Sequence, residues 1–318
     1  MKSLNLVSDH HQTESLAEDD MKKFLLVAVA LLVSATSVPA QFTFSSLDFP
    51  GSTLTTGRGI NNHGEIVGAY RLEPPRHAYL FKAGHFAPLA PSTVLGTNFS
   101  EAYKNNDRGD VVGWYQDDIG AAHGFLLRKG VVTTLDFPTA SDTQAFGVNE
   151  SGTVVGAWDI VDSDGNLLAL HGFIWKDGNF SQVDFPGAAA TILFGINARG
   201  DIVGEWDTDI FETTFHGFVL TKGQFTTIDV SFAGATSTQA NDINAKGSIV
   251  GTWIDADGVT SHGFLAEGAK FTSIDYPGSV GTTAWGINSA GQMVGNWFDS
   301  DGNTHGWVAT PANKGKPQ

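Results

Sequence analysis

The chain has 318 residues, no cysteine, and 34 Asp and Glu against 18 Lys and Arg, which gives a net charge of −16. A surface this acidic repels phosphate groups, so the composition argues against nucleic acid as a partner. The 38 Gly, 22 Phe and 8 Trp are typical of short strands joined by tight turns, and they exclude a disordered chain, in which aromatic residues are scarce.

The N-terminal segment has the parts of a secretory signal peptide. Residues 1–20 are polar and acidic, whereas Met21 opens a Met-Lys-Lys run that is followed by the apolar stretch Phe24–Val33. Small residues then lead to a cleavage point after Ala40. The apolar stretch is too short to cross a bilayer, which takes about 20 residues. We expect no membrane span, a true start at Met21 (or else an unusually long n-region), and export to the periplasm or the cell exterior.

Beyond this segment one pattern recurs six times, about 45 residues apart, as expected of a repeat fold in which each unit buries its apolar faces against its neighbours. It reads Ala-x-Gly-Ile-Asn-x-x-Gly-x-Ile-Val-Gly-x-Trp, then a variable stretch, His-Gly-Phe, and Phe-Thr-x-Ile-Asp-Phe-Pro-Gly. Asn-x-x-Gly predicts a tight turn between the first two strands of each unit. Its asparagines are Asn61, Asn106, Asn149, Asn197, Asn244 and Asn288.

The second strand of each unit, such as Ile202–Gly204, is followed by an aromatic residue two positions after its glycine. Ring and glycine share one face of the strand, and we expect glycine where a neighbouring sheet comes close. The third strand opens with His, and the fourth ends in Asp, as in Phe271–Asp275, before a Pro-Gly turn into the next unit. The aromatic residues are Tyr70, Tyr115, Trp158, Trp206, Trp253 and Trp297.

These units predict an all-β fold: a six-bladed β-propeller of four-stranded antiparallel blades over residues 41–311, with a C-terminal tail at 312–318. One fourth-strand segment, Phe44–Asp48, precedes every other strand, and the last unit stops near Pro311. We predict that this N-terminal strand pairs with the C-terminal blade, because closing the ring removes the exposed edges.

The repeats resemble those of the bacterial HAF-repeat proteins, which are named for a His-Ala-Phe motif. In this chain the middle residue is usually Gly, and His77-Ala78-Tyr79 keeps the Ala. The resemblance covers residues 44–310 and implies export and a repeat architecture, but no activity, substrate or catalytic residue. The second unit diverges most, since Lys104-Asn105-Asn106 replaces Gly-Ile-Asn. We expect this unit to be the least well packed or to be adapted to a partner.

One histidine stands at the same place in every unit: His77, His123, His171, His216, His262 and His305. Imidazole binds metals and moves protons, but single histidines on separate blades cannot form a cluster. We interpret them as hydrogen-bonded structural groups whose partners are the fourth-strand carboxylates 13 residues later: Asp136, Asp184, Asp229 and Asp275. The repeated aromatic residue likewise has two interpretations, packing between blades or stacking on sugars, and its presence in every unit favours packing.

From the second-strand glycine to the His, the spacing is 9, 10, 15, 12, 11 and 10 residues, which places adaptable loops on one rim. Three of these loops carry Asp-x-Asp-Gly, with the carboxylates Asp162, Asp164, Asp255, Asp257, Asp299 and Asp301. Alternating carboxylates suit Ca²⁺, although the EF-hand pattern is incomplete. Asp-Gly also forms hairpin turns, so we interpret these loops as turns, keep calcium as the alternative, and expect no other cofactor.

The sequence has no nucleophile elbow, phosphate loop or zinc-protease motif, so the catalytic residues, if any, are unknown. We expect a monomeric, secreted, non-catalytic binding or scaffolding protein for an extracellular or periplasmic glycan or protein. The alternative is a propeller enzyme that acts on a carbohydrate or lactone, either with or without Ca²⁺. An enzyme needs unlike groups in one pocket, whereas the six copies look nearly equivalent.

Overall fold

The computed structural model describes residues 41–89, 99–210 and 214–312. These residues form 25 β-strands and no α-helix. Accordingly, none of them builds a helix long and apolar enough to cross a membrane. The predicted start at Met21, the cleavage after Ala40 and most of the C-terminal tail lie outside the described residues.

Four sets of strands follow one another along the chain, and within each set every strand pairs antiparallel with the next. The first set is β7 (Phe99–Asn105), β8 (Val111–Gln116), β9 (Ala122–Arg128) and β10 (Val131–Leu135). The second is β11 (Asp142–Val148), β12 (Val154–Val161), β13 (Leu167–Lys176) and β14 (Asn179–Gln182). The third is β15 (Ala190–Ile196), β16 (Ile202–Asp207), β17 (His216–Thr221) and β18 (Gln224–Ile228). The fourth is β19 (Ser237–Ile243), β20 (Ile249–Ile254), β21 (Ser261–Glu267) and β22 (Lys270–Ile274).

Two further sets contain the ends of the described chain. One is β2 (Leu54–Thr55), β3 (Gly59–Ile60), β4 (Ile66–Arg71), β5 (His77–Lys82) and β6 (His85–Pro88), in which β2 and β3 are two pieces of one strand position. The other is β23 (Gly281–Ile287), β24 (Met293–Phe298), β25 (Thr304–Pro311) and β1 (Phe42–Leu47). The N-terminal β1 pairs antiparallel with β25 from Phe42 opposite Pro311 to Leu47 opposite Gly306, which is the pairing that the sequence predicts.

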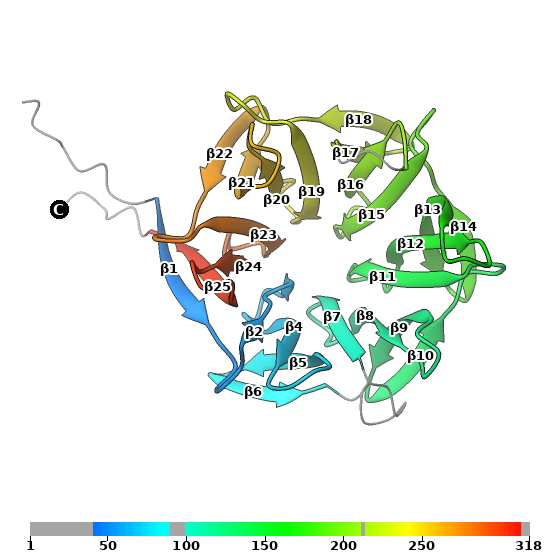
Figure 1. The fold of residues 1–318 in the computed structure, drawn as a ribbon, viewed down its shortest axis with the longest axis horizontal. Helices are drawn as coiled ribbons and strands as arrows, with labels where there is room; N and C mark the ends of the chain where they lie inside the picture. Colours follow the sequence, from blue (N-terminus) through cyan, green and yellow to red (C-terminus); the bar gives the residue numbers. More distant parts are fainter. Residues whose placement is uncertain (1–40, 90–98, 211–213, 313–318) are drawn as a thin grey trace, which may run out of the picture. The chain divides into compact units, whose positions relative to one another are not determined.

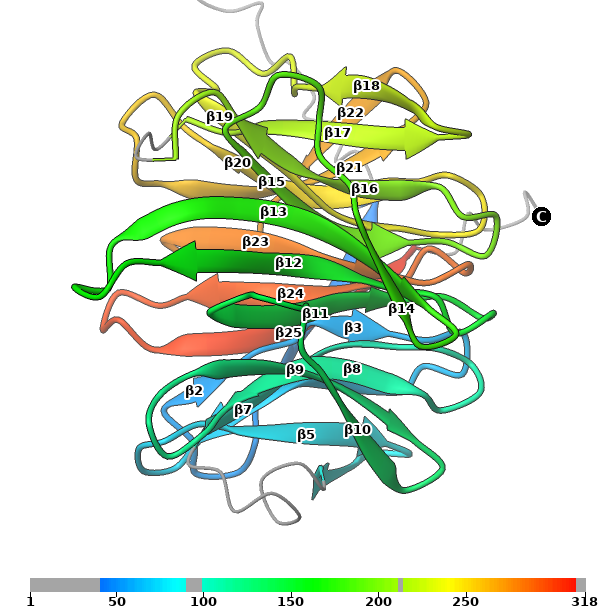
Figure 2. The ribbon, with the colours of Figure 1, turned by 90° about the vertical axis from the view of Figure 1, so that its right-hand side faces the viewer.

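The sets stand around a common axis, with the first strand of each set innermost and the last outermost (Figure 1). Single parallel pairs, Leu170 with Ala190 and Leu54 with Thr304, join neighbouring sets, so the strands count as four sheets. Because consecutive strands are antiparallel, the chain reverses direction at each of the two ends of the common axis (Figure 2). We call the end with the Asn-x-x-Gly turns the turn face, and the end with the loops between second and third strands, such as 162–166, the loop face.

Contrary to the expectation from the sequence, the second-strand glycines are not there because a neighbouring sheet comes close. A Cβ on Gly156 would lie 2.0 Å from the carbonyl oxygen of Gln144 and 2.7 Å from the ring of Phe173. Both residues belong to strands of the same sheet, so these glycines make room for their own neighbours rather than for an adjacent sheet. The innermost glycines do meet the next set of strands, since a Cβ on Gly147 in β11 would lie 2.7 Å from the carbonyl oxygen of Phe194 in β15.

Candidate functional site

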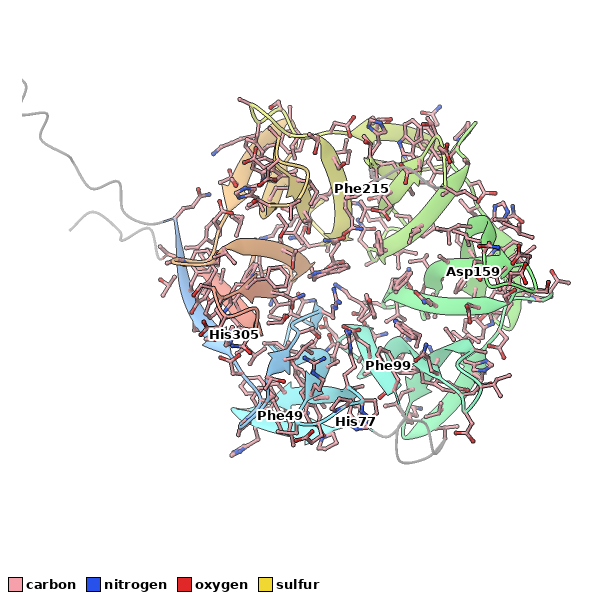
Figure 3. The ribbon with its side chains drawn as sticks, in the orientation of Figure 1. Phe49, His77, Phe99, Asp159, Phe215 and His305 are labelled. Atoms are coloured by element: carbon pink, nitrogen blue, oxygen red, sulfur yellow. The ribbon has the colours of Figure 1, made fainter. Side chains whose placement is uncertain are left out.

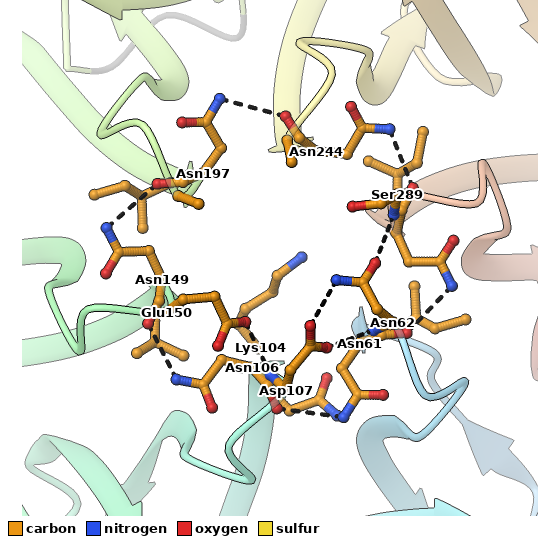
Figure 4. A pocket seen from close by; sticks show the side chains of 18 of the residues that line it. Asn61, Asn62, Lys104, Asn106, Asp107, Asn149, Glu150, Asn197, Asn244 and Ser289 are labelled. Atoms are coloured by element: carbon orange, nitrogen blue, oxygen red, sulfur yellow. Dashed lines mark hydrogen bonds between the residues drawn. The ribbon is translucent and has the colours of Figure 1, made fainter.

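The turn face is held around the axis by a cycle of asparagine side chains (Figure 4). Each repeated Asn accepts backbone N–H bonds two and four residues later, as Asn149 Oδ1 does from Ser151 and Thr153 at 3.0 Å. The glycine that closes each turn has a positive φ, +82° at Gly152, which is the left-handed geometry that the motif predicts. Each Asn Nδ2 also donates to the backbone oxygen of the next Asn, and Asn288 donates to Asn61 at 3.2 Å to complete the cycle.

One extra residue bulges from the innermost strand of each unit. The strand register shifts between Ala145 and Gly147, so Phe146 between them has no partner on β12. A β-bulge turns a side chain out of the regular alternation, and here it turns it toward the axis. The equivalent residues line a small central chamber: Arg58, Tyr103, Phe146, Phe194, Asn241 and Trp285. We call these six residues the hub.

Four aromatic rings of the hub contact one another in a closed circuit. Ring centroids are 4.8 Å apart for Tyr103 and Phe146, 5.2 Å for Phe146 and Phe194, 6.0 Å for Phe194 and Trp285, and 5.9 Å for Trp285 and Tyr103. Most of these pairs meet edge to face, the arrangement that ring quadrupoles prefer. The Arg58 guanidinium lies 4.0 Å from the Trp285 centroid, close enough for a cation–π contact.

Charged groups converge beside these rings. Glu101, almost fully buried, accepts from Arg58 Nε at 2.7 Å and from Arg76 Nη1 at 3.2 Å. Lys104 forms an ion pair with the buried Asp242, whose Oδ2 also accepts from the backbone N–H of Ile287 at 2.8 Å. The pair explains the divergence of the second unit, because Lys104 and Asp242 occupy the position where the other units have glycine.

The axis therefore brings together unlike groups that the near-equivalence of the repeats did not predict. The space for a ligand is small, however. The chamber between the hub side chains has a volume of about 10 Å³, and the hollow inside the asparagine cycle has about 70 Å³. One water needs roughly 10–15 Å³ and a small-molecule site roughly 300–1,000 Å³. The axis is thus filled by side chains and has room for a few waters only.

A larger groove of about 930 Å³ lies near the turn face between β13–β14 and β16–β18. Its apolar floor includes Ile174 and Phe225. Its carboxylates are engaged already, Asp184 with His171 at 3.1 Å and Asp201 with Asn197 at 2.9 Å. The groove therefore has the size of a ligand site but offers no free acid–base pair.

The predicted His–Asp hydrogen bonds are present. Nδ1 of His123, His171, His216 and His262 lies 2.8–3.1 Å from a carboxylate oxygen of Asp136, Asp184, Asp229 and Asp275 respectively. His305 makes the same contact, at 3.0 Å, with Asp48 after the N-terminal strand β1. In His123 and His305 the second nitrogen also meets a loop carboxylate, Asp117 at 3.3 Å and Asp299 at 3.1 Å. These histidines lie away from the axis, as His77 and His305 show in Figure 3.

The repeated aromatic residue is enclosed by two other rings. Trp158 stacks on Phe137 with centroids 4.3 Å apart and lies 4.8 Å from the His171 ring on its other side. Phe137 comes from the connection that leads into this unit, so the stack ties consecutive units together. Trp206, between Phe185 and His216, repeats the arrangement. These contacts agree with the interpretation that the repeated aromatic residue serves packing, because they cover both faces of its ring.

The calcium candidates lie in the loops of the loop face. Asp162 Oδ1 accepts from the backbone N–H groups of Asp164 and Asn166 at 2.9 Å, and Asp299 does the same for Asp301 and Asn303. In the third loop Asp257 Oδ1 accepts from the backbone N–H groups of Val259 and Thr260, while Asp255 Oδ1 accepts from that of Ala256 at 2.6 Å. The six aspartates make no group of three metal-ligating side chains, nor do any other described residues. The contacts are those of turn-forming aspartates.

Two other carboxyl groups have perturbed acidity. Burial, together with the nearby Asp142, raises the pKa of Asp159 to about 6. Burial also raises the pKa of Glu205 to about 7, although Glu205 accepts a hydrogen bond from Gln239 Nε2 at 2.6 Å. Neither residue stands out in the sequence, since both occupy variable positions within a second strand.

Comparison with known proteins concerns the fold. No family model and no curated protein sequence matches the chain. Among solved structures, an acylaminoacyl peptidase of Pyrococcus horikoshii matches with a TM-score of 0.51 and 10% identity over 82% of this chain and 45% of the peptidase. The Aleuria aurantia lectin matches with a TM-score of 0.49 and 10% identity over 87% of this chain and 98% of the lectin. The β-propeller domain of the Trilobed protease from Pyrococcus furiosus has a TM-score of 0.47 and 8% identity, over 84% and 96%. At 10% identity, the match with a TM-score above 0.5 bears on the fold alone.

Proposed function

We propose that this chain is an exported β-propeller that binds an extracellular or periplasmic partner through its loop face, as a monomer and without catalysis. The proposal includes six blades closed by β1 and membership of the HAF-repeat proteins. It also includes a signal peptide that is cleaved after Ala40 from a precursor starting at Met21.

Three contacts support a closed ring. β1 pairs with β25 over its whole length. His305, at the loop end of β25, bonds to Asp48 just after β1 at 3.0 Å. The asparagine cycle returns from Asn288 to Asn61. Together they join the first and last described units at the outer edge and near the axis, so that no outer strand of the last unit is left unpaired.

The observation that carries a binding function is the contrast between the ring and its loops. The axis is filled, the aromatic rings are enclosed and five of the six repeated histidines are hydrogen-bonded, so these groups build a rigid scaffold. Differences in length are concentrated in the loops between second and third strands, all of which emerge on the loop face. Variable loops on a rigid frame are the usual place for recognition.

An array of glycans and proteins, combined with a panel of hydrolase and lyase substrates, tests the function. We expect saturable binding without turnover. Turnover of any substrate, lost on substitution of a loop-face or hub residue, would reject the non-catalytic proposal. N-terminal sequencing of the exported protein checks the cleavage site, since a mature chain beginning anywhere but Gln41 contradicts it.

A carbohydrate- or lactone-acting enzyme is the second candidate, and Glu205 is the observation that favours it. A carboxyl group with a pKa of about 7 is matched to proton transfer at neutral pH. Glu205→Gln should abolish any turnover that the substrate panel detects, while Gln239→Leu should shift its pH profile. For Ca²⁺, calorimetry after EDTA treatment is the test: heat uptake that Asp299→Asn removes would make the Asp-x-Asp-Gly loops metal sites.

A further inference from the structure

Exposed apolar side chains are gathered on the loop face. Large hydrophobic residues that are strongly exposed in the described part of the chain are Leu72, Ile119, Val131, Leu168, Val259 and Val280. All but Val131 lie at the loop face, either in its loops and connections or, for Leu168, at the start of β13, and Ile119 and Val259 are 89% and 82% exposed. Single exposed hydrophobic residues are common on any protein. That five of the six lie at the loop face requires a reason, because chance would distribute them over both faces.

The loop face also holds most of the net charge. Five charged side chains lie inside the ring: Arg58, Glu101, Lys104, Glu205 and Asp242. Among the other described residues, the loops, the connections and the strand ends of the loop face carry eighteen carboxylates and two arginines. The turn face carries seven carboxylates and nine Lys or Arg. Solubility alone would be served by acidic residues on either face, so it does not account for this segregation.

The exposed apolar side chains and the excess of carboxylates on the loop face favour one class of partner over others. Nucleic acid and anionic lipid are repelled by the carboxylates. A neutral glycan gains nothing from the charge, and the aromatic rings on which sugars stack are covered, Trp158 by Phe137 and His171. A metal ion does not use exposed isoleucine or valine. A cationic protein segment that also presents apolar side chains matches both the charge and the apolar loop tips.

We propose that the loop face docks a basic, amphipathic protein segment, with lysine or arginine side chains facing the loop carboxylates and apolar side chains covering Ile119, Val259 and their neighbours. This inference rests on the proposed binding function and specifies the chemistry of the partner. Exposed ion pairs contribute little each, about 0.2–1 kcal/mol. Many weak pairs around a rim therefore give fast, salt-sensitive association, while the apolar tips supply contacts that salt does not screen.

The test uses the full chain and three synthetic peptides of equal length. One alternates Lys and Leu at helical spacing, the second replaces Leu by Ser, and the third replaces Lys by Glu. We expect saturable binding of the first peptide alone, weakened at least tenfold between low and physiological salt. Equal binding of the Ser peptide would overturn the proposal, because charge attraction alone then explains the affinity. Binding of the Glu peptide, or of none of the three, would overturn it as well.

Matched substitutions locate the site. Asp164→Asn with Asp301→Asn removes two exposed loop-face carboxylates whose side-chain oxygens accept no bond within the turn, and we expect about a threefold to tenfold weaker binding. Asp177→Asn with Glu267→Gln removes two carboxylates from the turn face and should leave binding unchanged. Ile119→Ser with Val259→Ser should weaken binding at high salt, whereas Val131→Ser should not.

Equal effects of the loop-face and turn-face pairs would refute the assignment to the loop face. If no peptide binds while an array finds a saturable glycan or another protein, the binding function stands and this inference alone falls. Turnover without peptide binding would reject both.

Discussion

Breaking the ion pair between Lys104 and Asp242 at the axis should destabilise the whole fold. The side chain of Lys104 is 12% exposed and that of Asp242 is 1% exposed, so each charge is compensated mainly by the other. Asp242→Asn keeps an acceptor for Ile287 N–H but leaves the ammonium of Lys104 buried without a counter-charge. Lys104→Met leaves the carboxylate with that one backbone bond. Loss of one partner of a buried pair costs about 3–5 kcal/mol, and either substitution should approach this cost.

The double variant separates this explanation from a simple loss of contacts. When both charges are removed, neither is left unpaired, and the free energy of unfolding should return to within about 1 kcal/mol of the wild type. At about 2–4 °C per kcal/mol for a chain of this size, each single variant should melt roughly 6–20 °C below the wild type. The assay is urea and thermal unfolding followed by near-UV circular dichroism. Lys82→Met is the control, because Lys82 pairs with Glu65 at 2.6 Å but is 65% exposed and should cost less than about 1 kcal/mol.

Additive effects of the two substitutions would refute the reasoning, since independent losses mean that the two charges do not compensate one another. A cost of Asp242→Asn no larger than that of Lys82→Met would refute it too.

Three further predictions concern the scaffold. The Asp48 and Asp299 carboxylates outweigh burial and raise the pKa of His305, so its contribution to stability should be fully present below the unfolded value and should be lost as pH rises through the folded value. The loss should be visible as a pH-dependent difference in melting temperature between wild type and His305→Gln. Trp206→Ala removes a ring that stacks at 4.3 Å on Phe185 and should cost about 3–5 kcal/mol in unfolding free energy without changing ligand affinity. Asn149→Ala leaves the N–H groups of Ser151 and Thr153 without their acceptor and should cost about 1–3 kcal/mol by urea unfolding; Ser151→Ala is its control.

The repeated positions were predictable because each residue makes the same kind of contact, with residues close to it in the sequence, in unit after unit. Asn149 shapes its own turn, and His171 meets Asp184 because a hairpin brings residues 13 apart side by side. Even the pairing of β1 follows from the order of segments along the chain. Such features need only a periodic sequence and the geometry of antiparallel strands.

The hub could not be derived in the same way. Its residues occupy the variable position x of Ala-x-Gly. The repeat pattern that predicts the fold therefore gives no indication of them. A bulge then decides that Phe146 points to the axis, and the register shift between Ala145 and Gly147 leaves no trace in the alternation of apolar residues. One signal was present: Lys104 and Asp242 replace glycine in the second and fifth units, and their ion pair joins these two units at the axis.

This pairing changes how the divergence of the second unit is interpreted. Four units keep glycine because their innermost strands approach the innermost strand of the next unit closely, as the 2.7 Å between a Cβ on Gly147 and the Phe194 carbonyl oxygen indicates. A side chain at this position must therefore extend into the axis, and a charge placed there alone would be buried without a partner. Lysine in the second unit is tolerable only with a carboxylate within reach, and the fifth unit supplies it. The divergence of the second unit is thus explained by its contact with the fifth unit of the same chain.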